Sequence, residues 1–164
     1  MAVVEKKTTA ITNLDALSSK SAIVGEKLHV VAGTVELANG DSIGSIIRLL
    51  RIPSHAKLSS LELSSDAVTS GAADIGLYDI AANGGAAVDV DRFGSAVSIA
   101  TAQDKTNVLH EADPTEISST CAGQRLWQRL GLTSDPGKVY DVALTLTAAA
   151  GAAGTVGLIA RYSL

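Results

Sequence analysis

The stretch VYDVALTLT, residues 139–147, alternates apolar side chains with polar or small ones along its whole length. Successive side chains of a β-strand point to opposite faces, so a period of two is typical of a strand with one buried face. Val142, Leu144 and Leu146 would form that face. The stretch therefore predicts a half-buried strand, and the chain around it repeats the pattern.

Further apolar segments of strand length are separated by turn signals such as Asn39-Gly40, Pro53 and Asn83-Gly84-Gly85. They predict strands at residues 28–37, 43–52, 58–63, 73–78, 88–93 and 156–162. The segment 43–52 also fits helical spacing, but its isoleucines and the Asn-Gly hairpin turn before it favour a strand. About eight short strands at this spacing predict an all-β fold, an antiparallel jelly-roll-like β-sandwich.

One short helix is expected at residues 122–130, capped by Ser119 or Thr120 and ended by Gly131. Its apolar side would contain Trp127, the expected anchor on the core, together with Leu126 and Leu130. The outward side would contain Gln124, Arg125, Gln128 and Arg129. Residues 95–102 could form a second helical turn.

Residues 1–25 differ from the rest, because they are rich in Thr, Ser, Ala and Lys and show no sustained period. We expect an extended N-terminal arm at 1–25 and a β-sandwich domain at 26–164. The arm contains more apolar residues than a solvated tail needs. We expect these residues to contact another subunit: Val4, Ile11, Leu14, Leu17 and Ile23.

The composition argues against several classes of function. The net charge is −4 and Lys6-Lys7 is the only adjacent basic pair, so no basic surface for nucleic acid is expected. No apolar run approaches the roughly 20 residues of a membrane span, and no secretory signal is expected. Cys121 is the only cysteine, which excludes an intrachain disulfide. Charged residues are only 18%, which suggests surface that is buried against partners.

The stretch GDSIG, residues 40–44, matches the G-x-S-x-G pattern of a hydrolase nucleophile elbow. That elbow needs a strand before the serine and a helix after it. Here Ser42 follows an Asn-Gly turn and precedes a predicted strand. We therefore interpret the stretch as a hairpin turn and not as a catalytic site.

Other candidate chemistry is equally sparse. The histidines His29, His55 and His110 lack the spacing of metal ligands, and His55 fits an exposed turn. Asp89 and Asp91 could offer two oxygens to a cation, but a solvated strand face is the simpler interpretation. The glycine-rich segment 151–157 lies between two predicted strands, so it predicts a hairpin loop and not a phosphate site. We expect no cofactor, metal or catalytic residue.

Five stretches in a fixed order carry a resemblance: IIRLLRIPSHAKLSSLELSSD, ADIGLYD, GGAAVDVDRFGSAV, LWQRLGLTSDPGKVYDVALTLT and AAGTVGLIARY. Across residues 28–163 the chain resembles a family of small virion proteins of tailed phages. The resemblance implies a capsid decoration or cement protein with a jelly-roll-like sandwich. Such a protein is made in the bacterial cytoplasm and binds the major capsid protein on the outside of the head, as a homo-oligomer, dimer or trimer.

Two other functions remain open at this stage. A jelly-roll carbohydrate- or receptor-binding module of a phage tail structure would need two or three exposed aromatic residues on one sheet face. The tyrosines available for this are Tyr78, Tyr140 and Tyr162. An enzyme of the cupin class would need several histidines and a glutamate on its strands, and that set is not visible.

Overall fold

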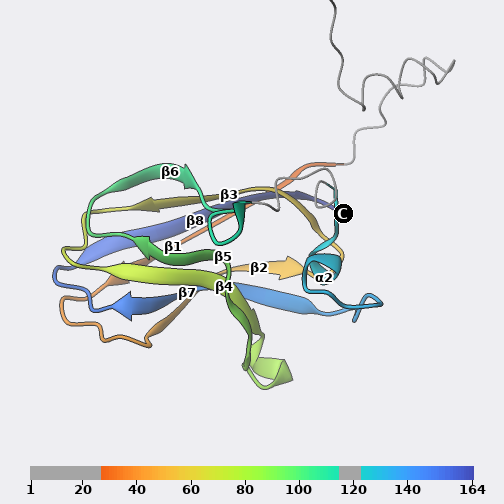
Figure 1. Cartoon of the computed structure of the whole chain (residues 1–164), viewed down its shortest axis with the longest axis horizontal. Helices are drawn as coiled ribbons and strands as arrows, with labels where there is room; N and C mark the ends of the chain where they lie inside the picture. Colours follow the sequence, from red (N-terminus) through yellow and green to blue (C-terminus); the bar gives the residue numbers. More distant parts are fainter. Residues whose placement is uncertain (1–26, 115–122) are drawn as a thin grey trace, which may run out of the picture.

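The computed structural model describes residues 27–114 and 123–164, which form eight β-strands in two layers (Figure 1). The first four strands are β1 (His29–Leu37), β2 (Ile46–Pro53), β3 (Lys57–Ser65) and β4 (Ala72–Asp79). The others are β5 (Ala87–Ser98), β6 (Gln103–Asn107), β7 (Val139–Ala148) and β8 (Gly154–Ser163). A single-turn 3-10 helix, η1 (Ala81–Asn83), lies between β4 and β5, and a short α-helix, α2 (Leu126–Arg129), precedes β7.

The two four-stranded sheets have the orders β1-β8-β3-β6 and β2-β7-β4-β5, and all pairings are antiparallel. The first strand pairs with the last, the second with the seventh, the third with the sixth and the fourth with the fifth. A long hairpin folded over into two layers gives this order. The predicted antiparallel jelly-roll-like β-sandwich is therefore confirmed.

The core lies between the inner faces of the two sheets, in which β7 and β8 are central strands. Val142, Leu144 and Leu146 of β7 are buried, as the alternation predicts. In the other sheet Val156 and Leu158 of β8 are buried too. Full burial of a side chain of this size contributes about 1.5–3 kcal/mol, so these rows hold the layers together.

Two predicted hairpins are wrong, because the segments join the two sheets and not paired strands. Asn39-Gly40 lies between β1 and β2, and residues 149–153 lie between β7 and β8. These two corners bind each other: the Gly40 amide donates to the Ala150 carbonyl at 2.8 Å, and the Ala150 amide donates to Asp41 at 3.0 Å. An Asn-Gly sequence predicts a chain reversal, but burial of the strands on both sides decides which strands pair. The Asn83-Gly84-Gly85 turn does join a paired hairpin, β4–β5.

The helix is shorter than predicted. It spans Leu126–Arg129, its N-cap residue is Arg125, and Gly131 follows with φ +70°. The predicted caps at residues 119 and 120 lie outside the described residues. Leu126 is fully buried and anchors the helix on the core, whereas Trp127 is only partly buried.

Arg129 corrects the predicted outward face, because its side chain is buried and stacks over the Phe93 ring at 5.7 Å. Residues 95–102 do not form a helical turn, since β5 continues to Ser98. Strand β6 was not predicted. Among the described strands it pairs only with β3, at the sheet edge, and it presents mostly polar side chains.

Candidate functional site

A bulge in β2 brings two arginines to one face of the sheet. Residues 48 and 51 would point to opposite faces of a regular strand. The pairing of β2 with β7 shifts register between Arg48 and Leu50, so Leu49 is the extra residue. As a result Arg48 pairs with Ala143 and Arg51 with Asp141, two positions on the same outer face of β7.

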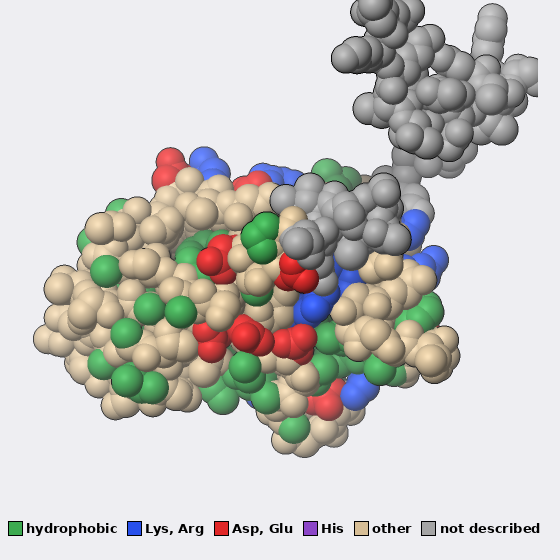
Figure 2. Space-filling view, in the orientation of Figure 1, with side chains coloured by type: hydrophobic (Ala, Val, Ile, Leu, Met, Phe, Trp, Pro, Cys, Tyr) green, Lys and Arg blue, Asp and Glu red, His purple; other side chains and the backbone are tan. Residues whose placement is uncertain are grey.

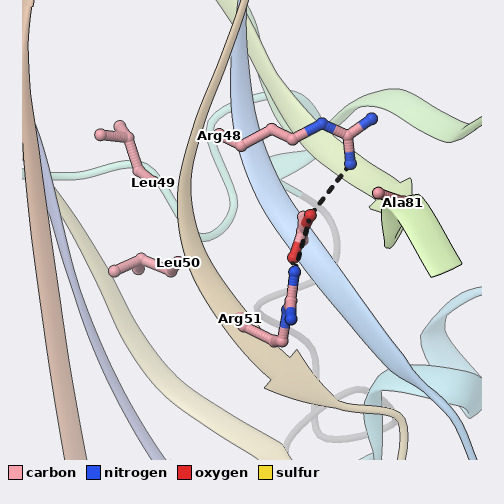
Figure 3. A pocket seen from close by; sticks show the side chains of 6 residues that line it. Arg48, Leu49, Leu50, Arg51 and Ala81 are labelled. Atoms are coloured by element: carbon pink, nitrogen blue, oxygen red, sulfur yellow. Dashed lines mark hydrogen bonds and ion pairs between the residues drawn. The ribbon is translucent and has the colours of Figure 1, made fainter. Parts of the chain in front are cut away.

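The carboxylate of Asp141 lies between the two arginines. Arg51 Nε donates to Oδ1 at 2.7 Å, and Arg48 Nη1 donates to Oδ2 at 3.0 Å. Figure 3 shows Arg48 and Arg51 approaching a carboxylate from two sides, while Leu49 and Leu50 point to the other side of β2. These residues and Ala81 line an open hollow of about 440 Å³.

Arg48 also fastens the β4–β5 hairpin, which projects from the body of the sandwich in Figure 1. Its Nη1 donates to the Asp79 carbonyl and its Nη2 to the Gly85 carbonyl, both at 2.7 Å. Its guanidinium lies 5.2 Å from the centre of the Tyr78 ring. Lys138 adds an ion pair to Asp79 at 2.9 Å, which raises the lysine pKa. The arginine therefore ties the base of the hairpin to β2 and β7.

The cluster of Arg48, Arg51 and Asp141 stabilises the fold and is poorly suited to proton transfer. Burial alone would raise the pKa of Asp141, but the hydrogen bonds and charges of Arg51 and Arg48 outweigh it and the pKa is lowered. Both carboxylate oxygens already accept hydrogen bonds. A carboxylate held ionised with its oxygens occupied is a weak general base. The cluster instead holds strand β2 and the hairpin in place.

A serine, a histidine and an aspartate also meet at the β2–β3 turn, without forming a catalytic triad. The buried Ser54 hydroxyl donates to Asp135 Oδ1 at 2.5 Å, and the Gly137 amide donates to the same oxygen at 2.9 Å. These two bonds lower the pKa of Asp135. A nucleophilic serine must give its proton to a base such as the neighbouring His55. Here the hydroxyl instead donates its hydrogen bond to the Asp135 carboxylate, and this bond fixes the loop before β7.

The other candidate catalytic and metal-ligating residues do not come together in one site either. Ser42 is exposed in the β1–β2 corner, and a turn and then a strand follow it, so it is not on a nucleophile elbow. The three histidines lie apart: His29 stacks on Tyr162 at 5.3 Å, His55 lies in the β2–β3 turn and His110 is 3.4 Å from Arg129. The predicted exposed turn for His55 is right in position, although the ring is partly buried.

Asp89 and Asp91 both lie in β5. Figure 2 shows acidic side chains gathered across the middle of the visible face, where β5 lies in Figure 1. Within residues 27–114 and 123–164, no group of three or more His, Cys, Asp or Glu side chains is placed to hold a metal. No helix in the described ranges is long and apolar enough to span a membrane. Glycines 154 and 157 of the glycine-rich segment lie within β8.

The predicted arm contacts, residues 4, 11, 14, 17 and 23, lie outside the described residues, as does Cys121. The tyrosines are placed, and all three are buried: Tyr78 is 2% exposed, Tyr140 1% and Tyr162 8%. Phe93 is fully buried as well. The aromatic platform that a carbohydrate-binding module needs is therefore not formed by these side chains.

Large apolar side chains are exposed along one edge of the sandwich, where β1 and β2 are the outermost strands of their sheets. An added Cβ at Gly33 of β1 would lie 2.2 Å from the Leu49 carbonyl oxygen of β2, so the two strands form one continuous surface. We call it the apolar edge. Its exposed side chains are Leu28, Val30, Val35, Ile43 and Ile46. Sequence reasoning missed it, because periodicity does not reveal which strands end a sheet.

Comparison with known proteins identifies the fold. No family model matches the sequence, and no curated protein matches it. The fold is similar to a chain in the capsid asymmetric unit of cyanophage Pam1, with 18% identity over 90% of this chain and 92% of that chain and a TM-score of 0.55. It is also similar to a chain in the capsid of Ralstonia phage GP4, with 17% identity over 84% of each chain and a TM-score of 0.55. The likeness shows that a similar fold occurs in chains of these two phage capsids.

Proposed function

We propose that this protein is a structural component of a phage virion, a decoration or cement protein that binds the major capsid protein on the outside of the head. The observation that carries the proposal is the fold likeness over 90% of this chain and 92% of a chain from a phage capsid. The sequence resemblance to small virion proteins points the same way. Neither requires an enzymatic activity, and the proposed role is purely structural.

The chemistry of the described residues supports a structural role. The buried carboxylate of Asp141 is engaged by two arginines, and the buried hydroxyl of Ser54 by Asp135. These groups fix strands and loops and leave no activated nucleophile among themselves. A cement protein needs a rigid body and surface to bury against partners, and the apolar edge offers such surface.

The arm, residues 1–25, is the proposed attachment to a neighbouring subunit or to the shell. Its apolar residues would be buried only on assembly, because ordering a backbone costs about 1–2 kcal/mol per residue and needs compensating contacts. Replacing Ile11, Leu14 and Leu17 together with Asp in the full chain should weaken binding to heads while the sandwich stays folded.

The test is co-sedimentation of the purified full chain with heads that lack it, followed by heating of the decorated and bare heads. We expect saturable binding and a higher temperature of head disruption. As a matched control, replacing Thr8, Thr9 and Thr12 with Ser should leave binding unchanged. Failure of the wild-type chain to bind heads at micromolar concentration would overturn the proposal, and equal binding by the Asp variant would remove the arm from it.

A further inference from the structure

Within residues 27–114 and 123–164, strand β1 is a sheet edge with little of the usual protection. It pairs with β8 over nine consecutive residues without a register shift, and its other side has no partner strand among the described residues. Its sequence, HVVAGTVEL, contains one charged side chain, Glu36, and no proline. An edge of this length and composition is a template for pairing with another strand.

Apolar side chains accompany this open edge. Val30 is 58% exposed and Leu28 56% at the start of β1, and Ile43, in the corner beyond the other end of β1, is 68% exposed. Exposed groups of this size along one edge are typical of a surface that is buried in an assembly. The edge therefore offers both unpaired backbone groups and apolar area to a partner.

The opposite edge of the sandwich cannot serve as that partner. Strand β6 has five residues, with Asp104 and Lys105 among them. Strand β5 shifts register three times against β4 and carries Asp89, Asp91 and Arg92. Short length, charge and bulges each oppose strand addition. Head-to-tail pairing between unlike edges would also build an open filament, whereas like edges close at two copies.

We propose that two copies of this chain pair along β1, antiparallel about a two-fold axis, so that the two β1-β8-β3-β6 sheets join into one. An axis at Gly33 would set Val31 opposite Val35 and Ala32 opposite Thr34. Glu36 would lie opposite Val30, so no like charges meet. Valine pairs are favourable across antiparallel strands. The pairing holds whether or not the chain binds a capsid, so its test is separate from that of the proposed function.

The first experiment measures the mass of the full chain by sedimentation equilibrium across a range of concentrations. We expect a dimer for the wild type. The double variant Val30→Lys, Val35→Lys should dissociate at concentrations at least 100-fold higher than the wild type, with an unchanged circular dichroism spectrum. The matched control, Val88→Lys with Val90→Lys on β5, should remain a dimer. A monomeric or trimeric wild type would overturn the proposal, as would an equal effect of both double variants.

The second experiment locates the contact. In a Cys121→Ser background, Ala32→Cys should give a covalent dimer with a short bis-maleimide, whereas Asp91→Cys on the opposite edge should not. If Ile11→Lys with Leu14→Lys abolishes the dimer and the β1 lysines do not, the arm is the occupant and the β1 pairing is wrong. If Ala32→Cys does not cross-link in a sample that is dimeric by mass, the dimer uses another surface and the proposal fails.

Discussion

The two long edges of the sandwich differ in how far their backbone is protected from pairing with a strand of another chain. At the β5–β6 edge the backbone is bent out of regular pairing: Ala96 and Lys105 adopt left-handed conformations at φ +50° and +53°. At the β1–β2 edge β1 is regular, weakly charged and flanked by exposed Leu and Val side chains. Among the described residues the β5–β6 edge (the closed edge) is protected against strand addition and the β1 edge (the open edge) is not, which is the difference on which the proposed β1 pairing rests.

Carboxylates complete the protection of the closed edge. Asp74 Oδ1 accepts from the Ala96 amide at 2.7 Å, and Glu111 Oε2 accepts from the Ser95 amide at 2.8 Å. These amides lie where β5 leaves regular pairing, and without the carboxylates they would be available to another chain. The open edge has a different kind of support, because there β1 and β2 touch through backbone at Gly33.

The largest expected effects come from adding one methyl group at Gly33 of the edge strand β1 and one at Gly76 of β4, next to the edge strand β5. In Gly33→Ala the Cβ would lie 2.2 Å from the Leu49 carbonyl oxygen, and in Gly76→Ala it would lie 2.1 Å from the Asp89 carbonyl oxygen. Both neighbours are backbone, so a strand must move. We expect each variant to lose about 3 kcal/mol of unfolding free energy in urea titrations.

Ala87→Val adds volume at an exposed position of β5 and provides the control. It should change the unfolding free energy by less than about 0.5 kcal/mol. If Gly33→Ala were as stable as the wild type, the close contact between β1 and β2 would not hold, and the apolar edge would not be one surface.

The next effect tests the ion cluster that fixes β2 beside the open edge. Asp141→Asn leaves Arg48 and Arg51 facing each other without a countercharge, and should cost about 2 kcal/mol at pH 7, less than a fully buried pair because the arginines are partly exposed. The pKa of Asp141 is lowered in the folded state, so its contribution is present above the unfolded value of about 3.9 and is lost as pH falls through the folded value.

Urea titrations from pH 7 down to pH 2 measure this difference. The wild type and Asp141→Asn should converge in acid. Asp104→Asn, at an exposed position of β6, should follow the wild type throughout. A constant gap between the wild type and Asp141→Asn at all pH values would mean that packing, and not the charge, holds the cluster.

The sequence predicts the strands well, because burial of alternate residues is a local signal. This signal is visible in the alternation at Val142, Leu144 and Leu146 and in the apolar segments of β1 to β5 and β8. Strand β6 was not predicted, because its sequence QDKTN has almost no buried side chains. The strand is defined by its backbone hydrogen bonds to β3, whose residues are far away in the sequence.

Pairing and site geometry could not be predicted, since they depend on long-range contacts. The chain does reverse direction at Asn39-Gly40, as the sequence predicts, but there it passes from one sheet to the other. The arginine cluster needs the bulge at Leu49, whose one trace in the sequence is the Leu49-Leu50 doublet between two arginines. Arg129 faces inward because Phe93, from β5, offers its ring. Asp141 is far in sequence from Arg48 and Arg51, and Phe93 is far in sequence from Arg129.

A smaller effect is expected from removing the carboxylates that protect the closed edge. Asp74→Ala and Glu111→Ala each free one backbone amide that water can reach, so each should cost about 1 kcal/mol. The double variant should also open the β5 edge to pairing. Sedimentation should then show species larger than those of the wild type, and unchanged sedimentation would mean that the charges and bulges of β5 are sufficient protection.

The smallest expected effect has the opposite sign, and it comes from Asp89→Asn on the closed edge. Burial, with the neighbouring Asp91, raises the pKa of Asp89, although Arg92 acts against this. An acid with a raised folded pKa binds its proton more tightly in the folded state, so the wild type loses stability as pH rises from about 3.9 through the folded value. The neutral asparagine does not. Asp89→Asn should therefore be slightly more stable than the wild type at pH 7 and should lose that advantage below pH 4, the reverse of Asp141→Asn. Urea titrations at pH 3, 5 and 7 check the sign, and a variant that is less stable at pH 7 would show that Asp89 supports its edge as an anion.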